Sequence, residues 1–171
     1  MVIGDLGDHI SQLPALARWH YDKWGPLTGA SSFDSYVALL TQAAGSRRVP
    51  SVLIAMADGE LLGSATLVAS DLPPRPDLTP WLAQLFVAPT RRREGAGAAL
   101  VRAVLQRAQQ CGYARVYLYT SGTLPEYYRR LGWRVVERLA YLQRERTVMA
   151  CEVGLAAAPN IGMKPTACGR G

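Results

Sequence analysis

The stretch from Leu85 to Val101 constrains the fold more than any other part of this 171-residue sequence. An apolar, β-prone run ends at Pro89, the arginines Arg91–Arg93 follow, and Gly95 and Gly97 open a segment of helical composition. The first N–H groups of a helix have no partner inside the helix, and the helix dipole adds partial positive charge there. The order of strand, cationic turn and helix therefore predicts a site for an anion such as a diphosphate.

A simpler interpretation is a tight turn with its arginines in water, and a lone Gly-x-Gly would favour it. The strand before the turn, Pro89 and the helix after it favour the binding site instead. The stretch is not a Walker phosphate loop, because it lacks Gly-Lys-Ser/Thr. It is not a dinucleotide fingerprint either, because the third glycine is missing.

Apolar periodicity and turn residues predict the remaining elements. We expect an edge strand at Val2 and Ile3, strands over 51–57, 60–69, 81–88, 115–120, 133–140 and 147–153, and helices from Ser11, after Ser31-Ser32, and over 95–110 and 125–131. Gly25-Pro26 should end the first helix. A strand–helix–strand crossover in the middle predicts one parallel pair. The predicted fold class is α/β, a mixed and mostly antiparallel sheet with a central parallel pair and helices on both faces.

The length fits one domain, which we place at residues 1–153, followed by a poorly patterned tail at 154–171. The net charge of +6 favours an anionic partner, which could be nucleic acid, an acidic membrane or a phosphorylated ligand. The acidic N-terminus lacks a signal-peptide pattern, no run could span a bilayer, and the three cysteines lack zinc-ligand spacing. We expect a cytoplasmic protein without a metal.

Two motifs resemble one known family. Val87-x-Pro89-x-x-Arg92-x-x-Gly95-x-Gly97 looks like the acetyl-CoA motif of the GNAT superfamily of N-acetyltransferases, whose signature is Arg/Gln-x-x-Gly-x-Gly/Ala. The run from Tyr127 to Trp133, Tyr-Tyr-Arg-Arg-Leu-Gly-Trp, is similar to the Phe-Tyr-x-x-x-Gly-Phe box of that family. The element order matches over about residues 1–153. The resemblance implies transfer of the acetyl group of acetyl-CoA to a primary amine by direct attack in a ternary complex.

The resemblance also implies the site residues. The parallel strands would splay to hold CoA, with the backbone of Leu85, Phe86 and Val87 along the pantetheine arm and an N–H near Phe86 or Val87 on the oxyanion. The turn that would cradle the pyrophosphate comprises Arg92, Arg93, Glu94, Gly95, Ala96, Gly97 and Ala98. Tyr128 matches the tyrosine that protonates the departing thiolate. The alternative interpretation of Tyr128 is a core aromatic residue, a role that also suits the adjacent Tyr127.

The sequence departs from the family pattern at the general base. Many relatives carry a glutamate in the strand before the glycine motif. The comparable positions here are Trp81 and Ala83, with Gln84 next to them, and none of these can act as a base. A water chain ending on Asp71, Asp77 or a backbone carbonyl would suffice for an amine of modest pKa. His20 titrates near neutrality, although a histidine on an aromatic helix is more often a packing residue.

The acceptor and the partners stay open at this point. We expect the acceptor site in the first two helices, their connection and the proline-rich loop 71–80, with Trp19, Tyr21, Trp24 and Trp81 as wall or core residues. The amine could be a small molecule or a peptide, and the protein a monomer or a homodimer. A catalytically weak acyl-CoA sensor is the alternative function. A nucleic-acid module is suggested by charge alone, without a recognition pattern, and a membrane partner is not expected.

Overall fold

The computed structural model describes residues 1–28 and 32–154, so the predicted tail lies, apart from Gly154, outside the described residues. Its elements are β1 (Val2–Asp5), the 3-10 helix η1 (Leu6–Gln12), α1 (Leu13–Thr28), α2 (Phe33–Ala44), β2 (Ser51–Ala57), β3 (Glu60–Val68), β4 (Trp81–Val87), the 3-10 helix η2 (Pro89–Arg91), α3 (Ala96–Gln110), β5 (Arg115–Thr120), α4 (Leu124–Arg130), β6 (Arg134–Tyr141) and β7 (Arg144–Glu152). Within the described ranges, no helix is both long enough and apolar enough to cross a membrane.

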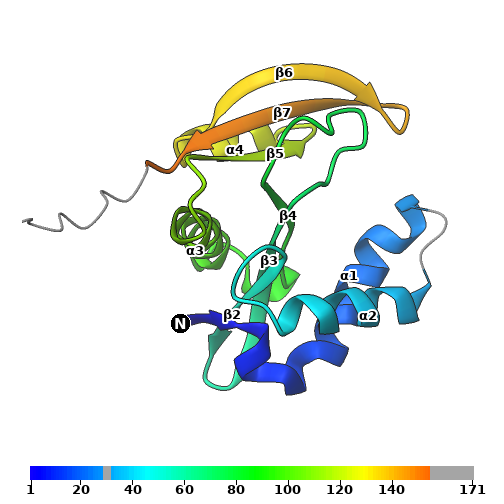
Figure 1. Ribbon diagram of the computed structural model, residues 1–171. Coiled ribbons are helices and arrows are strands. Elements are labelled where there is room, and N and C mark those ends of the chain that lie inside the picture. The colour runs from blue at the N-terminus through cyan, green and yellow to red at the C-terminus, as the bar shows by residue number, and fades with distance from the viewer. Residues whose placement is uncertain (29–31, 155–171) are drawn as a thin grey trace, which may run out of the picture.

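The strands form one seven-stranded sheet in the order β1-β2-β3-β4-β5-β7-β6 (Figure 1). All neighbouring strands run antiparallel except β4 and β5, which are parallel. The crossover between these two strands is α3, as the sequence predicts. The predicted fold class, a mixed sheet with one central parallel pair, is therefore confirmed.

The parallel pair touches at one end only. Trp81 of β4 pairs with Tyr117 of β5, and the Tyr117 N–H donates to the carbonyl of Pro80 at 2.9 Å. β3 accompanies β4 as far as Val87, whereas β5 turns to pair with β7 along its whole length. The second half of β4 therefore has no partner on its β5 side, and the sheet is split there.

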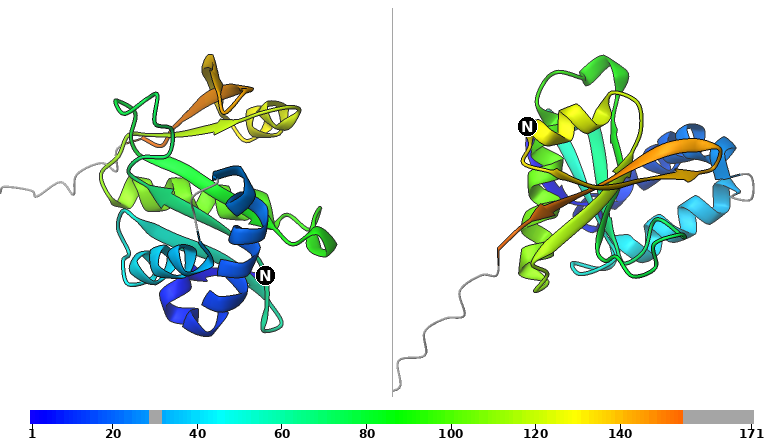
Figure 2. Two further views of the ribbon diagram at one scale, coloured as in Figure 1. Left: turned by 90° about the vertical axis from the view of Figure 1, so that its right-hand side faces the viewer. Right: turned by 90° about the horizontal axis from the view of Figure 1, so that it is seen from above.

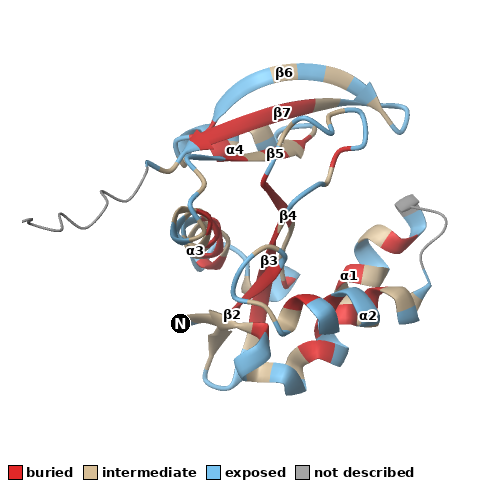
Figure 3. Cartoon of the chain, viewed as in Figure 1, coloured by how far each residue is buried: buried red, intermediate tan, exposed pale blue. Residues whose placement is uncertain are grey.

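Helices cover both faces of the sheet (Figure 2). The alternation along β2 assigns the faces, because successive side chains of a strand point to opposite sides. Val52 and Ile54 pack with α1 and α2, and Leu53 and Ala55 pack with α3. The buried face of α3, which includes Leu100, packs on strands β2 to β5, whereas the outer strand β6 is largely exposed (Figure 3).

The first helix is longer than predicted. It continues through Gly25 and Pro26 to Thr28, although proline lacks an N–H and normally interrupts a helix. Gly25 is buried against the Tyr21 ring, where a Cβ would lie 2.9 Å from the ring. Packing of this last turn outweighs the local stop signal. The strands predicted at 133–140 and 147–153 instead span Arg134–Tyr141 and Arg144–Glu152, joined by a turn with positive φ at Leu142 and Gln143.

A partly buried ion pair joins the N-terminus to α3. Arg107 Nη1 lies 2.9 Å from Asp5 Oδ1, and Arg107 Nη2 donates to Asp5 Oδ2 at 3.0 Å. Both side chains are nearly buried, with 12% and 13% of their surface exposed. Removing Arg107 would leave the poorly solvated Asp5 carboxylate with only exposed Arg47, whose Nη1 lies 3.9 Å from Asp5 Oδ2.

We predict that Arg107→Met lowers the free energy of unfolding by about 3 kcal/mol, the cost of leaving a nearly buried carboxylate poorly compensated. The matched control is Arg115→Met, because Arg115 pairs with Glu152 at 2.6 Å while half exposed. That control should lose less than about 1 kcal/mol. Urea unfolding measures both values, and equal losses in the two variants would contradict this role of the buried pair.

Candidate active site

The turn predicted to bind an anion leaves its helix uncapped. Gly95 occupies the N-cap position of α3 with φ of +85°, a left-handed conformation that suits glycine, and no side chain caps the helix. The first intrahelical bond goes from the Ala99 N–H to the Gly95 carbonyl at 3.0 Å. The N–H groups of Ala96, Gly97 and Ala98 precede it and, as in any first helical turn, have no helical acceptor.

The three arginines before this turn have different partners. Arg91 bridges Glu60 at 3.0 Å and Glu94 at 3.1 Å, so its charge is compensated inside the protein. Arg92 donates from Nε to the Val87 carbonyl at 3.3 Å, which ties the turn to the end of β4. Arg92 and Arg93 are exposed and, within the described ranges, have no acidic partner. The positive field of the turn therefore comes from Arg92 and Arg93.

A bulge re-aims the second half of β4. Thr66 of β3 pairs with Ala83, and Ser64 pairs with Phe86, so two β4 residues, Gln84 and Leu85, face one residue of β3. Gln84 adopts φ of +50°, which few non-glycine residues do. A bulge leaves an extra residue outside the ladder and bends its strand. The bend follows the point at which β4 parts from β5, so it widens the split in the sheet.

A cavity of about 630 Å³ lies in this split. Its lining includes every residue predicted from the acetyl-CoA motif except Glu94: Leu85, Phe86, Val87, Arg92, Arg93, Gly95, Ala96, Gly97 and Ala98. The Glu94 side chain is held by Arg91 instead. Tyr128 also lines the cavity. The structure thus brings the two sequence motifs, Val87–Gly97 and Tyr127–Trp133, to one cavity.

Tyr128 is almost buried and packs edge-on against Tyr127 and Trp133, with ring centroids 5.1 and 6.0 Å away. Burial, followed by the nearby Tyr127, raises the pKa of Tyr128 well above its usual range. Its phenol is therefore neutral and can donate a proton. Tyr127 lines the same cavity, and its hydroxyl lies where a Cβ on Gly97 would come within 2.9 Å. Tyr127 is thus placed at the glycine turn as well as in the core, which its sequence pattern did not indicate.

Sequence reasoning also missed Lys23 and Leu124, which line the cavity from α1 and α4. The signal for Lys23 was its place between Trp19 and Trp24, which contact the Phe86 ring at centroid distances of 5.2 and 6.3 Å. Helical neighbours three and four residues apart share a face. The aromatic face of α1 thus brings a lysine ammonium to the end of β4. Trp81, in contrast, is fully buried core.

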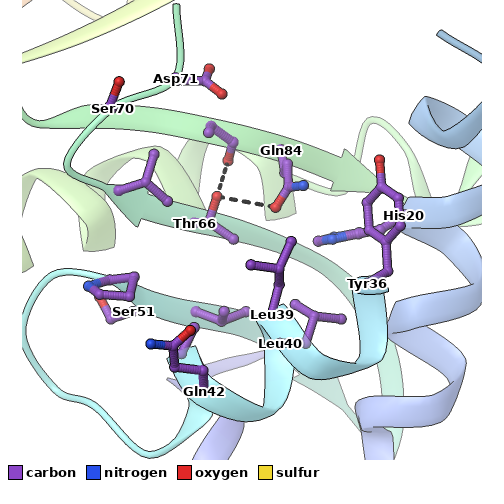
Figure 4. Close-up of a pocket in the computed structure, with 15 residues that line it drawn as sticks. His20, Tyr36, Leu39, Leu40, Gln42, Ser51, Thr66, Ser70, Asp71 and Gln84 are labelled. Atoms are coloured by element: carbon purple, nitrogen blue, oxygen red, sulfur yellow. Dashed lines mark hydrogen bonds between the residues drawn. The ribbon is translucent and has the colours of Figure 1, made fainter. Parts of the chain in front are cut away.

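A second cavity of about 240 Å³ lies on the other side of the bulge, between α2 and strands β2, β3 and β4 (Figure 4). We call it the Asp71 pocket; its lining includes His20, Tyr36, Leu39, Ser51, Asp71 and Gln84. Burial raises the pKa of Asp71 to about 6. Asp77 is exposed, and the hydrogen bond from Arg75 lowers its pKa. Asp71, not Asp77, is therefore the carboxylate that faces a cavity.

His20 is fully buried, and its Nε2 lies 2.9 Å from Ser64 Oγ while its Nδ1 has no partner. Burial lowers the pKa of His20 to about 4, so the imidazole is neutral at physiological pH. A folded-state pKa below the unfolded value of about 6.5 means that the unfolded chain binds the proton more readily. The stability that His20 contributes is therefore complete above pH 6.5 and declines as the pH falls toward 4.

We predict that acidification from pH 6.5 to 4.5 costs the wild-type protein up to about 1.4 kcal/mol per pH unit through His20. The raised pKa of Asp71 acts in the opposite direction, but it is present in both the wild type and a His20→Gln variant. Urea unfolding at both pH values should show a weaker loss in His20→Gln. The same pH dependence in both proteins would contradict a buried neutral histidine.

Comparison with known proteins identifies the family. A model of the acetyltransferase (GNAT) family matches residues 13–133. No curated protein matches the chain at a significant level. Solved structures share the fold at low identity. An aminoglycoside 6'-N-acetyltransferase complexed with coenzyme A is 19% identical with a TM-score of 0.64, over 90% of this chain and 97% of that one.

Two further structures agree. Salmonella typhimurium yncA, in a structure with its cofactor acetyl-CoA, is 17% identical with a TM-score of 0.68, over 94% of this chain and 98% of that one. The ribosomal-protein-alanine N-acetyltransferase of Brucella melitensis is 16% identical with a TM-score of 0.69, over 89% of this chain and 99% of that one. Since the family model spans well over half of the sequence and both motifs meet at one cavity, this protein belongs to the GNAT family of acetyltransferases.

Proposed function

We propose that the protein transfers the acetyl group of acetyl-CoA to a primary amine by direct attack in a ternary complex. The observation that carries this proposal is the cavity in the split of the sheet, which joins an uncapped helix start, a bulged strand and a buried phenol. Structures of proteins with the same fold contain CoA or acetyl-CoA, which supports CoA as the occupant.

The residues present fit CoA. The free N–H groups at the start of α3, with Arg92 and Arg93 beside them, match a pyrophosphate in charge and donor number. The backbone of Leu85 to Val87 lacks a β5 partner, so an extended pantetheine arm can pair with it as an added strand. Within the described residues, no cluster of histidine, cysteine, aspartate and glutamate could hold a metal ion, and none of these steps needs one.

The acetyl transfer then needs three groups. A backbone N–H near Phe86 or Val87 stabilises the negative charge that develops on the acetyl oxygen. The amine nitrogen forms a bond to the carbonyl carbon as the carbon–sulfur bond breaks, and Tyr128 donates its proton to the leaving thiolate. The attacking nitrogen loses its proton to solvent water, since Trp81 and Ala83, the β4 residues comparable to the family's glutamate, and the adjacent Gln84 cannot act as a base.

The names of two structurally similar proteins indicate which amines this fold can acetylate. One neighbour is an aminoglycoside N-acetyltransferase and another a ribosomal-protein-alanine N-acetyltransferase, so the fold serves small molecules and proteins alike. The absence of a basic side chain at the usual place in β4 favours a second candidate function, an acyl-CoA sensor with weak turnover. Both functions require CoA binding, and only the enzyme requires Tyr128.

We predict that acetyl-CoA at a hundred times its dissociation constant stabilises the protein by about 2.7 kcal/mol, read as a rise in melting temperature. Gly97→Leu should abolish this rise without unfolding the protein, because the new side chain enters the cavity beside Tyr127. The control is Gln106→Leu on the exposed face of α3, which should keep the rise. An equal rise in all three proteins would place CoA elsewhere.

The function itself is tested by release of free thiol from acetyl-CoA with a panel of amines and peptides. Tyr128→Phe should lower kcat about a hundredfold or more, the usual contribution of a general acid, with little change in CoA affinity. If the wild type binds CoA but releases no thiol with any acceptor, the sensor is the better account. An unchanged kcat in Tyr128→Phe would rule out the phenol as the acid.

A further inference from the structure

The Asp71 pocket and the CoA cavity flank the same bulge. Ala83 and Gln84 line the pocket, while the next residues, Leu85 to Val87, line the cavity. Helix α1 repeats this division, since His20 lines the pocket and Lys23, three residues later, lines the cavity. A molecule in the Asp71 pocket would therefore approach β4 from the side opposite to CoA, at the strand where the thioester is expected.

The pocket holds polar atoms without partners. His20 Nδ1 and Ser51 Oγ are buried and form no hydrogen bond. The Asp71 carboxylate, on the loop after β3, has no hydrogen-bond or ion-pair partner among the described residues, although its pKa of about 6 leaves it charged at neutral pH. Unpaired buried polar groups are costly, and native proteins rarely keep them without a ligand or water.

These groups share one property, which is that all of them can accept a hydrogen bond. A carboxylate only accepts, a hydroxyl can do both, and a neutral imidazole accepts at Nδ1 in the tautomer that carries its proton on Nε2, the nitrogen 2.9 Å from Ser64 Oγ. Within the described part of the chain, no lysine or arginine lines the pocket. Its chemistry therefore fits a ligand rich in N–H donors with positive charge.

The remaining wall of the pocket is apolar, formed largely by Leu39, Leu40, Val52, Val68 and Ala83. Figure 4 shows Asp71 and Ser70 on one side of it and His20 and Tyr36 on another, with Thr66 and Gln84 between. A polyhydroxylated ligand would leave without partners those of its hydroxyl groups that face the apolar residues. A short methylene chain between polar ends would fit.

Asp71 follows the end of β3 that is remote from the bulge. It follows Val68, which pairs with Trp81 at the start of β4, whereas the bulge at Gln84 is three residues further on. At about 3.3 Å per residue, the level of Val68 and Trp81 lies on the order of 10 Å along the sheet from that of Gln84. The positive charge that Asp71 can bind is therefore a second one, at the far end of the acceptor.

We propose that the Asp71 pocket is an acceptor subsite that binds the distal cationic group of a short amine, with Asp71 as its ionic partner. Ser51 and His20 accept further hydrogen bonds from this group, and the apolar wall covers the methylene chain. The inference rests on the proposed function, because it assigns the other end of the same molecule to acetyl transfer. It names the acceptor class as compact dications rather than polyhydroxylated amines.

The test compares cadaverine with pentylamine, which has the same chain length and one charge fewer. Calorimetric titration of each amine into the full-length protein, with CoA present, measures binding without requiring turnover. Cadaverine should bind about tenfold more tightly than pentylamine, the value of one charge-assisted hydrogen bond. Asp71→Asn should abolish this preference and leave the affinity for pentylamine unchanged.

The matched control is Asp77→Asn, because Asp77 lies in the same loop but is exposed and pairs with Arg75 at 2.9 Å. It should keep the preference for cadaverine. Equal affinities of the two amines for the wild type, or equal weakening of both by Asp71→Asn, would overturn the subsite. Thiol release with cadaverine and with pentylamine tests the acetyl transfer separately. A preference for cadaverine without any release would contradict the proposed function and leave Asp71 only as the partner of a bound cation.

Discussion

The single contact between β4 and β5 is the constraint on which the site depends. Were the two strands paired along their length, as parallel neighbours in a sheet normally are, the backbone of Leu85–Val87 would be hydrogen-bonded and covered. One pair, Trp81 with Tyr117, holds the strands together, and β7 takes the other edge of β5. Trp81 is fully buried at this junction. The fold thus combines a closed core at one end of β4 with an open backbone at the other.

The bulge at Gln84 turns this open end into the boundary between two cavities. It follows the junction, so the strand bends after it has left β5. On one side of the bend, the CoA cavity extends to the uncapped start of α3. On the other side, the Asp71 pocket extends to α2 and to Asp71, in the loop after β3. Helix α1 crosses behind the bend with Trp19 and Trp24 against Phe86. The acetyl donor and the amine acceptor can therefore approach β4 from two sides without a conformational change.

Local sequence signals predicted the parts of the site that depend on backbone chemistry. Gly95 and Gly97 indicated the helix start, and the two motifs indicated that Tyr128 lies near it. The rest depends on contacts between distant segments. Gln84 has no local feature that predicts a bulge, and the sequence does not distinguish Asp71 from Asp77, of which only Asp77 pairs with Arg75. Pro26 likewise gave a stop signal that packing of α1 overrides.

The most direct test of this account is a map of backbone amide signals by nuclear magnetic resonance during titration with CoA. We expect the largest changes on the amides of Leu85–Val87 and of residues 93–98. Because the Asp71 pocket lies beyond the bulge, the amides of Ser51 and Asp71 should change little. Large changes around Asp71, with the turn before α3 unaffected, would contradict the claim that the split between β4 and β5 is the cofactor site.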